Sequence, residues 1–97
     1  MLIARVVGSA VATAKDATLT GRKLLLVREA DQTGAEQGPV FVAVDGAGAG
    51  TGELVLVARG SAGRHSSTTA ADQPVDALVV GILDSMDVGG TVTFRKS

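Results

Sequence analysis

PVFVAVDGAGAGTGELVLVAR, residues 39–59, joins two runs rich in valine and leucine through a segment in which glycine alternates with small residues. The flanking runs, residues 39–45 and 53–59, have the length and composition of β-strands and are too short for a typical helix. The glycine-containing segment between them, residues 46–52, is a turn signal. This stretch therefore predicts two strands separated by a turn and indicates an all-β protein.

Further apolar runs of the same kind lie on both sides of this stretch, and each is bounded by turn residues. They predict strands at residues 2–13, 23–30, 77–83 and 90–95, separated by residues 16–21, 31–38, 60–74 and 84–89. About six strands at this spacing, without a long helical pattern, favour a small antiparallel barrel or sandwich. One short helix is expected after Gly60, although Gly63 weakens it.

The composition excludes several classes of function. We expect one domain over residues 1–97, because no linker or change of composition divides them. Nine Lys and Arg against ten Asp and Glu leave no basic surface for nucleic acid or an acidic membrane. The absence of cysteine excludes disulfides, thiol catalysis and Cys-ligated zinc. Residues 1–8, with Arg5 inside the apolar run, do not resemble a signal peptide. No run approaches the roughly 20 apolar residues of a membrane span, so we expect a soluble protein.

The apolar content is high for a small monomer, because 45% of the residues are hydrophobic and only 2% are aromatic. A domain of this size buries about 60% of its unfolded surface. Both alternating faces of residues 2–13 are largely apolar, and the other predicted strands also lack a polar outer face. Since large exposed apolar surfaces usually mark protein interfaces, we infer an oligomer.

The glycine-containing segment suggests a phosphate-binding loop, but its spacing does not fit. A dinucleotide fingerprint beginning at Gly46 requires glycine at Thr51, and one beginning at Gly48 requires it at Glu53. No Lys-Ser/Thr pair follows, and the next segment is a predicted strand rather than a helix. A turn or a close approach between backbones is the favoured interpretation.

Ser61, His65 and Asp72 are the residue types of a hydrolytic triad and lie in one predicted loop. No G-x-S-x-G motif surrounds Ser61, and closeness in sequence does not create triad geometry. A single histidine without cysteine leaves only carboxylates as metal ligands, and none has the spacing of a calcium loop. We therefore expect no enzyme activity, no cofactor and no metal.

The main alternative is an OB-type ligand-binding or single-strand nucleic-acid-binding module, which is also built on a small barrel. Such surfaces combine aromatic stacking platforms with a positive groove. Here Phe41 and Phe94 are the only aromatic residues, and the net charge is −1. These observations disfavour nucleic acid as a partner.

Five blocks of sequence occur in an order typical of one protein family. They are IARVVGSAVATAK (3–15), LTGRKLLLV (19–27), VAVD with GAGTGE and VLV (42–57), GS followed by Arg64 (60–64), and PVDA with VVGILD (74–84). Together they cover nearly the whole chain and resemble the EutN/CcmL family of bacterial microcompartment vertex proteins. Ala47 replaces the larger aliphatic residue usual in this family, and Gly63 replaces its common alanine.

The resemblance implies a small antiparallel, OB-like β-barrel of about five to six strands with one short helix, assembled as a pentameric ring. It implies a structural role at the five-fold vertices of a carboxysome-like polyhedral shell, whose flat hexamer sheets cannot close without five-fold units. The implied partners are further copies of this chain and hexameric shell proteins, with no nucleic acid, membrane or cofactor. The implied location is cytoplasmic, in the shell of a bacterial microcompartment.

Two glycine-containing segments, residues 48–53 and 60–64, are expected at subunit contacts or near the five-fold axis. Glycine permits positive φ angles and lets neighbouring backbones approach closely. Arg64 could bond a carboxylate of the next subunit, with Glu53 or Asp45 as the acceptor. Alternatively, both segments are ordinary exposed turns. The candidate residues are Gly48, Ala49, Gly50, Gly52, Glu53, Gly60, Ser61 and Arg64.

Overall fold

A computed structural model describes residues 1–13, 21–60 and 76–97 of the chain. These residues form seven strands and contain no helix. The helix expected after Gly60 falls outside the described residues. In chain order the strands are β1 (Leu2–Ala10), β2 (Leu24–Ala30), β3 (Glu36–Asp45), β4 (Leu54–Arg59), β5 (Ala77–Ile82), β6 (Ser85–Val88) and β7 (Thr91–Arg95). The all-β prediction is confirmed.

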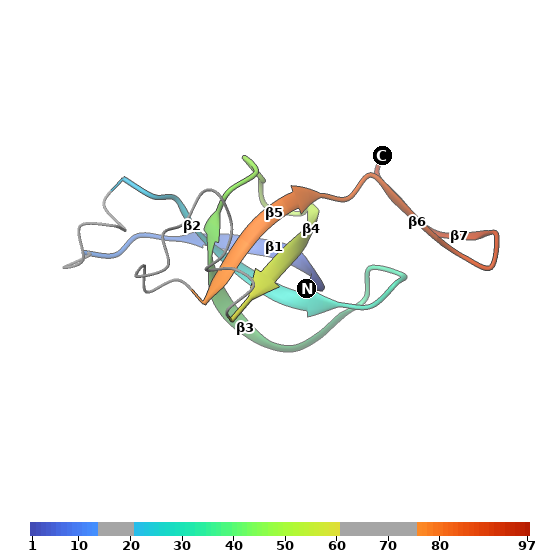
Figure 1. Cartoon of the computed structure of the whole chain (residues 1–97), viewed down its shortest axis with the longest axis horizontal. Helices are drawn as coiled ribbons and strands as arrows, with labels where there is room; N and C mark the ends of the chain where they lie inside the picture. Colours follow the sequence, from blue (N-terminus) through green and yellow to red (C-terminus); the bar gives the residue numbers. More distant parts are fainter. Residues whose placement is uncertain (14–20, 61–75) are drawn as a thin grey trace.

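Five of the strands close into a barrel in the order β1-β2-β3-β5-β4, with β4 returning to β1 (Figure 1). Four of the five pairings are antiparallel. The exception is β3 with β5, a short parallel contact in which Val44 pairs with Leu78 and Asp45 with Val79. The expected barrel is therefore confirmed, but it is not antiparallel throughout.

β5 lies between β3 and β4, so the glycine-containing segment connects two strands that are not neighbours in the barrel. It passes close to β5 at Val79. Gly46 donates its backbone N–H to the Val79 carbonyl oxygen at 2.9 Å, and a Cβ added to Gly46 would lie 2.7 Å from that oxygen. Glycine is required here because the two backbones approach too closely for any side chain.

The barrel interior is filled by small aliphatic side chains rather than by aromatic rings. Its buried cluster consists of Ala4, Val6, Leu25, Val27, Ala43, Ala49, Val55, Val57, Ala77 and Val79, with Leu2, Phe41, Ala47 and Ile82 packed against it. Valine and alanine suit this position because β-branched and small residues fit the narrow interior of a closed five-stranded sheet.

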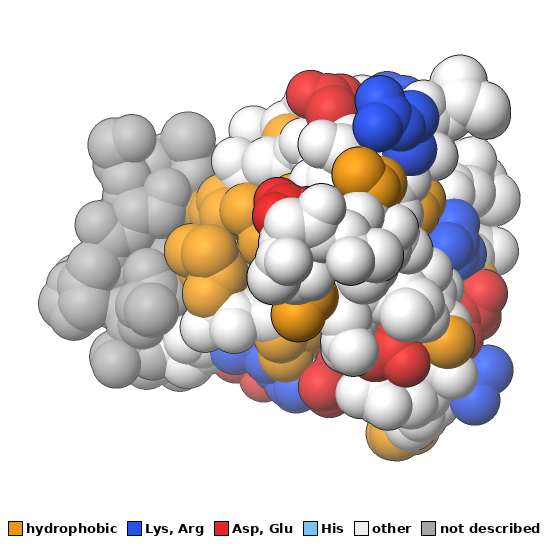
Figure 2. Space-filling view, turned by 90° about the vertical axis from the view of Figure 1, so that its right-hand side faces the viewer, with side chains coloured by type: hydrophobic (Ala, Val, Ile, Leu, Met, Phe, Trp, Pro, Cys, Tyr) orange, Lys and Arg blue, Asp and Glu red, His pale blue; other side chains and the backbone are white. Residues whose placement is uncertain are grey.

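The outer face of the barrel is also partly apolar, as the sequence predicted. Val44 and Leu78 are buried in a second cluster with Leu24, on the side of the sheet opposite to Ala43 and Val79. Val7, Val40, Val42 and Val80 are 36–50% exposed. Figure 2 shows one face of the molecule, on which hydrophobic side chains are scattered among charged and polar ones.

β6 and β7 form a separate two-stranded sheet that extends away from the barrel (Figure 1). Residues 84–89 were expected to separate strands, but β6 occupies most of this range. Val88 pairs with Thr91 across a two-residue turn, in which Gly89 and Gly90 have φ angles of 58° and 84°. Two consecutive positive φ angles define a tight hairpin turn, and Gly-Gly is a sequence signal for it. The described part of the chain contains no helix long and apolar enough to cross a membrane.

Candidate functional site

The segment between β3 and β4, residues 46–53, is the glycine-rich loop, and the side chain of Asp45 organises it. One carboxylate oxygen, Oδ1, accepts the backbone N–H groups of Ala47 at 3.0 Å, Gly48 at 2.9 Å and Ala49 at 3.3 Å. The Asp45 side chain is only 4% exposed. An aspartate at the last position of a strand can thus replace the lost sheet hydrogen bonds with bonds to its own loop.

Lys23, just before β2, holds the same loop from outside. Its ammonium group lies 3.9 Å from Asp45 Oδ2 and donates to the carbonyl oxygen of Ala49 at 3.2 Å. The backbone N–H of Asp45 in turn bonds the Lys23 carbonyl at 2.9 Å. Asp45 is therefore almost fully buried and surrounded by donors from its own subunit.

The positions along the loop differ in their exposure. Gly48 and Gly52 are exposed and have positive φ angles of 74° and 95°, which disfavour any other residue. Ala49 lies between them with its side chain in the barrel core, 1% exposed. Gly50 has an ordinary φ, and a Cβ there would meet only Glu53 Oε1, at 3.6 Å. The loop is thus anchored inward at Ala49 and exposes its backbone at Gly48 and Gly52.

Glu53 closes the loop through both of its carboxylate oxygens. Oε1 accepts the Gly50 N–H at 2.6 Å, and Oε2 lies 2.7 Å from the ammonium group of Lys96 near the C-terminus. The hydrogen bond from Lys96, followed by that from Gly50, lowers the pKa of Glu53 below its ordinary value. The same bond from Glu53 raises the pKa of Lys96. Both side chains are therefore charged at neutral pH.

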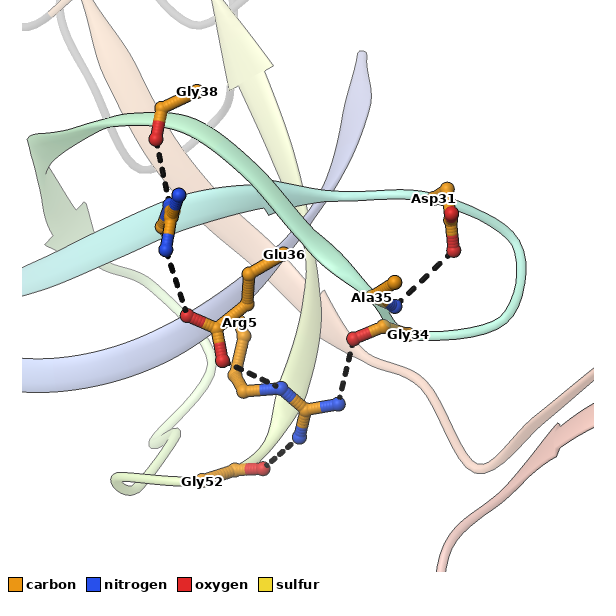
Figure 3. Close-up of polar contacts among 8 residues, drawn as sticks. Arg5, Asp31, Gly34, Ala35, Glu36, Gly38 and Gly52 are labelled. Atoms are coloured by element: carbon orange, nitrogen blue, oxygen red, sulfur yellow. Dashed lines mark hydrogen bonds and ion pairs between the residues drawn. The ribbon is translucent and has the colours of Figure 1, made fainter.

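Arg5 joins the glycine-rich loop to the turn between β2 and β3 (Figure 3). Its guanidinium donates to the carbonyl oxygens of Gly52 at 2.7 Å and Gly34 at 3.0 Å, and its Nε lies 3.5 Å from Glu36. Glu36 also lies 3.8 Å from Arg28. A planar guanidinium with several fixed donors can hold two loops at once, which an ammonium group does less well.

These contacts build a rigid surface rather than a reactive centre. The carboxylates and cations around the loop are engaged with one another or with backbone groups, as the distances above show. No cluster of three or more potential metal ligands exists among the described residues. The arrangement is suited to fixing the shape of a loop on the outside of a barrel, as required for a contact between macromolecules.

The structure separates the two segments that were expected to form contacts. Gly48, Ala49, Gly50, Gly52 and Glu53 are in the loop before β4, whereas Gly60 follows the far end of that strand. The six residues of β4 place these ends roughly 20 Å apart. Gly60 is exposed, has a φ of 62° and donates its N–H to Asp76 O at 2.8 Å. Ser61 and Arg64 lie outside the described residues, as do His65 and Asp72.

Sequence reasoning missed the three cations that hold the loop, Arg5, Lys23 and Lys96. Arg5 carried a detectable signal, because it is the one charge inside the apolar run of residues 2–13. A charge on an otherwise apolar strand requires a partner, and this one has three. Lys23 and Lys96 carried no such signal, because each stands beside another basic residue at the end of a strand.

The two aromatic residues do not form a stacking platform. Phe41 packs partly against the core, and the guanidinium of Arg59 covers its ring at 4.4 Å from the centroid. Phe94 is on β7, near Gly34 at the base of the hairpin. Phe41 and Phe94 therefore lie at separate places and do not form one stacking surface.

Comparison with known proteins gives consistent matches along the chain. The family model described as "Ethanolamine utilisation protein EutN/carboxysome" matches residues 1–84. The carboxysome shell vertex protein CcmL of Synechocystis sp. is 46% identical over 99% of this chain and 95% of its own length. The microcompartment shell vertex protein EutN of Escherichia coli K12 is 44% identical over 99% of this chain and all of its own length.

Solved structures of similar proteins have the same fold. A carboxysome subunit CcmL superposes with a TM-score of 0.90 at 45% identity, with full coverage of both chains. The pentameric microcompartment shell protein GrpN from Rhodospirillum rubrum gives a TM-score of 0.80 at 38% identity, covering 91% of this chain and 99% of its own.

Proposed function

This chain belongs to the EutN/CcmL family of microcompartment shell proteins, and from that premise we propose that its pentamers cap the five-fold vertices of a bacterial microcompartment. It is a structural vertex protein of the shell and not an enzyme. The observation that carries this function is the end-to-end match to shell vertex proteins, which includes the glycine-rich loop and the barrel.

The mechanism is geometric. A flat layer of hexameric shell proteins has no curvature of its own, and a closed polyhedron requires five-fold units at its corners. Identical subunits around a five-fold axis use two different surfaces, one contacting the subunit before and one the subunit after, and such contacts close into a ring. The half-exposed valines on the outside of this barrel supply apolar surface for such contacts.

We further propose that hexameric shell proteins are the outer partners of the pentamer and that single-stranded nucleic acid is not a partner. Two observations support the proposal that nucleic acid is not a partner. The net charge is slightly negative, and the guanidinium of Arg59 lies over the ring of Phe41. A strand-binding groove requires the opposite arrangement, with exposed rings in a positive channel.

Shell closure tests this function directly. We would co-express this chain with the hexameric shell protein encoded nearest to it and examine the assemblies by electron microscopy. Closed polyhedra are expected with the chain present, and open sheets or tubes without it. Equal numbers of closed particles in both preparations would contradict the vertex role.

We propose that the glycine-rich loop contributes to a subunit contact through Gly48, Gly50, Gly52 and Glu53, with Ala49 supporting it from inside. Gly60, Ser61 and Arg64 remain candidates for a second contact. Support comes from the exposed backbone of the loop and from the internal anchoring by Asp45 and Arg5, which keeps its shape constant.

Gly50→Val tests the loop contact, because Gly50 has an ordinary φ and space for a Cβ. The variant is expected to retain the β-type circular dichroism of the wild type and to shift the pentamer toward smaller species in native mass spectrometry. An unchanged pentamer in Gly50→Val would remove the loop from the contact.

A further inference from the structure

A pocket of about 330 Å³ lies between the glycine-rich loop, the start of β4 and the chain that follows β7. Its lining residues come from parts of the chain that are far apart in sequence, and they include Arg5, Thr51, Glu53, Phe94, Arg95 and Lys96. This volume falls at the lower end of the range found for small-molecule sites. The pocket can therefore hold one small molecule or ion.

Cationic side chains outnumber carboxylates in this pocket. Three cations line it, those of Arg5, Arg95 and Lys96, and Glu53 is the only acidic side chain that does so. Both carboxylate oxygens of Glu53 are already bonded, Oε1 by the Gly50 N–H and Oε2 by the Lys96 ammonium group. The pocket therefore has an excess of positive side chains.

Arg95, the last residue of β7, is the cation of the pocket that has no partner among the described residues. It is exposed, and its guanidinium makes no hydrogen bond or ion pair with them. Arg5 is held by two carbonyl oxygens and by Glu36, as Figure 3 shows. A guanidinium carries five N–H donors and an ammonium group three, so Arg5 keeps donors beyond these contacts and Lys96 keeps donors beyond its bond to Glu53.

The neutral residues of the lining complete a site for an anion. Thr51 is exposed at the pocket, and its hydroxyl makes no hydrogen bond with the part of the chain that the structure describes. A hydroxyl can donate to the same anion that a guanidinium binds. Leu54 and Phe94 supply an apolar wall. Apolar neighbours lower the local dielectric constant, which strengthens hydrogen bonds to charged groups.

We propose that this pocket binds a small oxyanion, a phosphate or carboxylate group, through Arg5, Arg95 and Lys96. Guanidinium groups bind both kinds of anion through pairs of parallel hydrogen bonds. The bound anion connects β1, the glycine-rich loop and the end of β7, and so fixes the base of the β6–β7 hairpin against the barrel. All of the lining residues belong to one chain, so the site does not depend on the proposed pentamer.

Isothermal titration calorimetry with sodium phosphate tests the site. Sodium chloride at equal ionic strength is the reference, because any exposed charge responds to screening by salt. The wild type is expected to bind phosphate saturably. Arg95→Gln is expected to raise the dissociation constant about tenfold, because a hydrogen bond between two charged groups is lost. Arg95→Lys keeps the charge without the planar donor fork and is expected to give an intermediate value.

Arg59→Gln is the matched control, because it removes the same charge at the other end of β4, roughly 20 Å from the pocket. This variant is expected to bind phosphate like the wild type. Equal dissociation constants for the wild type and Arg95→Gln would overturn the site. Heats of phosphate binding no larger than those of chloride would overturn it as well.

A titration with sodium acetate distinguishes the two kinds of anion. Acetate binding as tight as phosphate binding assigns a carboxylate ligand to the pocket, and weaker acetate binding assigns a phosphate group. Native mass spectrometry of the same preparations separates the site from the vertex function. Phosphate binding without pentamers would contradict only the vertex role, and pentamers without phosphate binding would contradict only the site.

Discussion

Among single residues, Asp45 holds the glycine-rich loop through three backbone amides and is almost fully buried. Asp45→Ala leaves these donors without their acceptor, which costs about 1–3 kcal/mol for a buried group. We expect this loss of unfolding free energy in urea denaturation at a fixed protein concentration. Asp45→Asn keeps one acceptor oxygen and is expected to lose less.

Asp76→Ala is the control for this measurement, because Asp76 is exposed and its side chain makes no hydrogen bond with the described residues. It is expected to change the unfolding free energy by less than about 0.5 kcal/mol. Equal stability of Asp45→Ala and Asp76→Ala would show that the loop does not depend on the carboxylate.

The Glu53–Lys96 pair gives a prediction for pH. The bonds from Lys96 and Gly50 lower the pKa of Glu53 from its ordinary 4.5, so its stabilising contribution is present above that value and is lost as the pH falls through the lower pKa of the folded state. The difference in stability between the wild type and Glu53→Gln is therefore expected to be largest near neutral pH and to shrink below pH 4.5. Thermal unfolding at pH 7, 4 and 3 measures it.

The effect on Lys96 has the opposite sign. Its pKa is raised above 10.5 by Glu53, so its contribution is present below that value and is lost at more alkaline pH. Both groups are solvent-accessible, so high salt is expected to reduce the difference. A difference that does not vary with pH would show that Glu53 acts through its size alone.

At the level of elements, two glycines of the loop are predicted to respond differently to the same substitution. Gly48→Ala places a Cβ at a φ of 74° and is expected to cost about 1–2 kcal/mol of unfolding free energy. Gly50→Ala meets only Glu53 Oε1 at 3.6 Å and is expected to be nearly neutral. Chemical denaturation of the two variants measures the contrast, and equal costs would contradict the loop conformation.

The strands illustrate what local patterns can and cannot predict. Five of the six predicted strands coincide with barrel strands and the sixth with β7, because alternating apolar residues and turn signals are local features. β6 was missed because Met86 and Val88 are its only apolar residues, and the Gly-Gly turn was divided between a predicted separator and a predicted strand. The insertion of β5 between β3 and β4 is a long-range pairing with no local signal.

For the whole molecule, assembly is the central prediction. Native mass spectrometry at micromolar concentration is expected to give a species of five 9.7 kDa chains as the main component. A monomer would leave the outer valines of the barrel in water. A dominant monomer would contradict the vertex role, and a stable hexamer would contradict its five-fold geometry.

Nucleic-acid binding is the second prediction for the whole molecule. Fluorescence anisotropy with labelled single strands at physiological salt is expected to show no saturable binding, because the charges are balanced and Phe41 is covered by Arg59. Micromolar affinity that is lost in Phe41→Ala or Phe94→Ala would support the OB-type alternative instead.

The sequence by itself determined the all-β class, most strand boundaries, the apolar outer surface and membership of a shell-protein family, since composition, alternation and ordered motifs are all readable along the chain. Only the tertiary structure decided how the glycine-rich loop is held. Its anchors Lys23, Arg5 and Lys96 are 26, 47 and 43 residues from the loop groups that they bond. Closure of the barrel brings β1 and β2 to this loop, and the return of the chain through the β6–β7 hairpin brings Lys96 to it. The sequence shows that these basic side chains are present, but only the folded chain shows which oxygen atoms they bond.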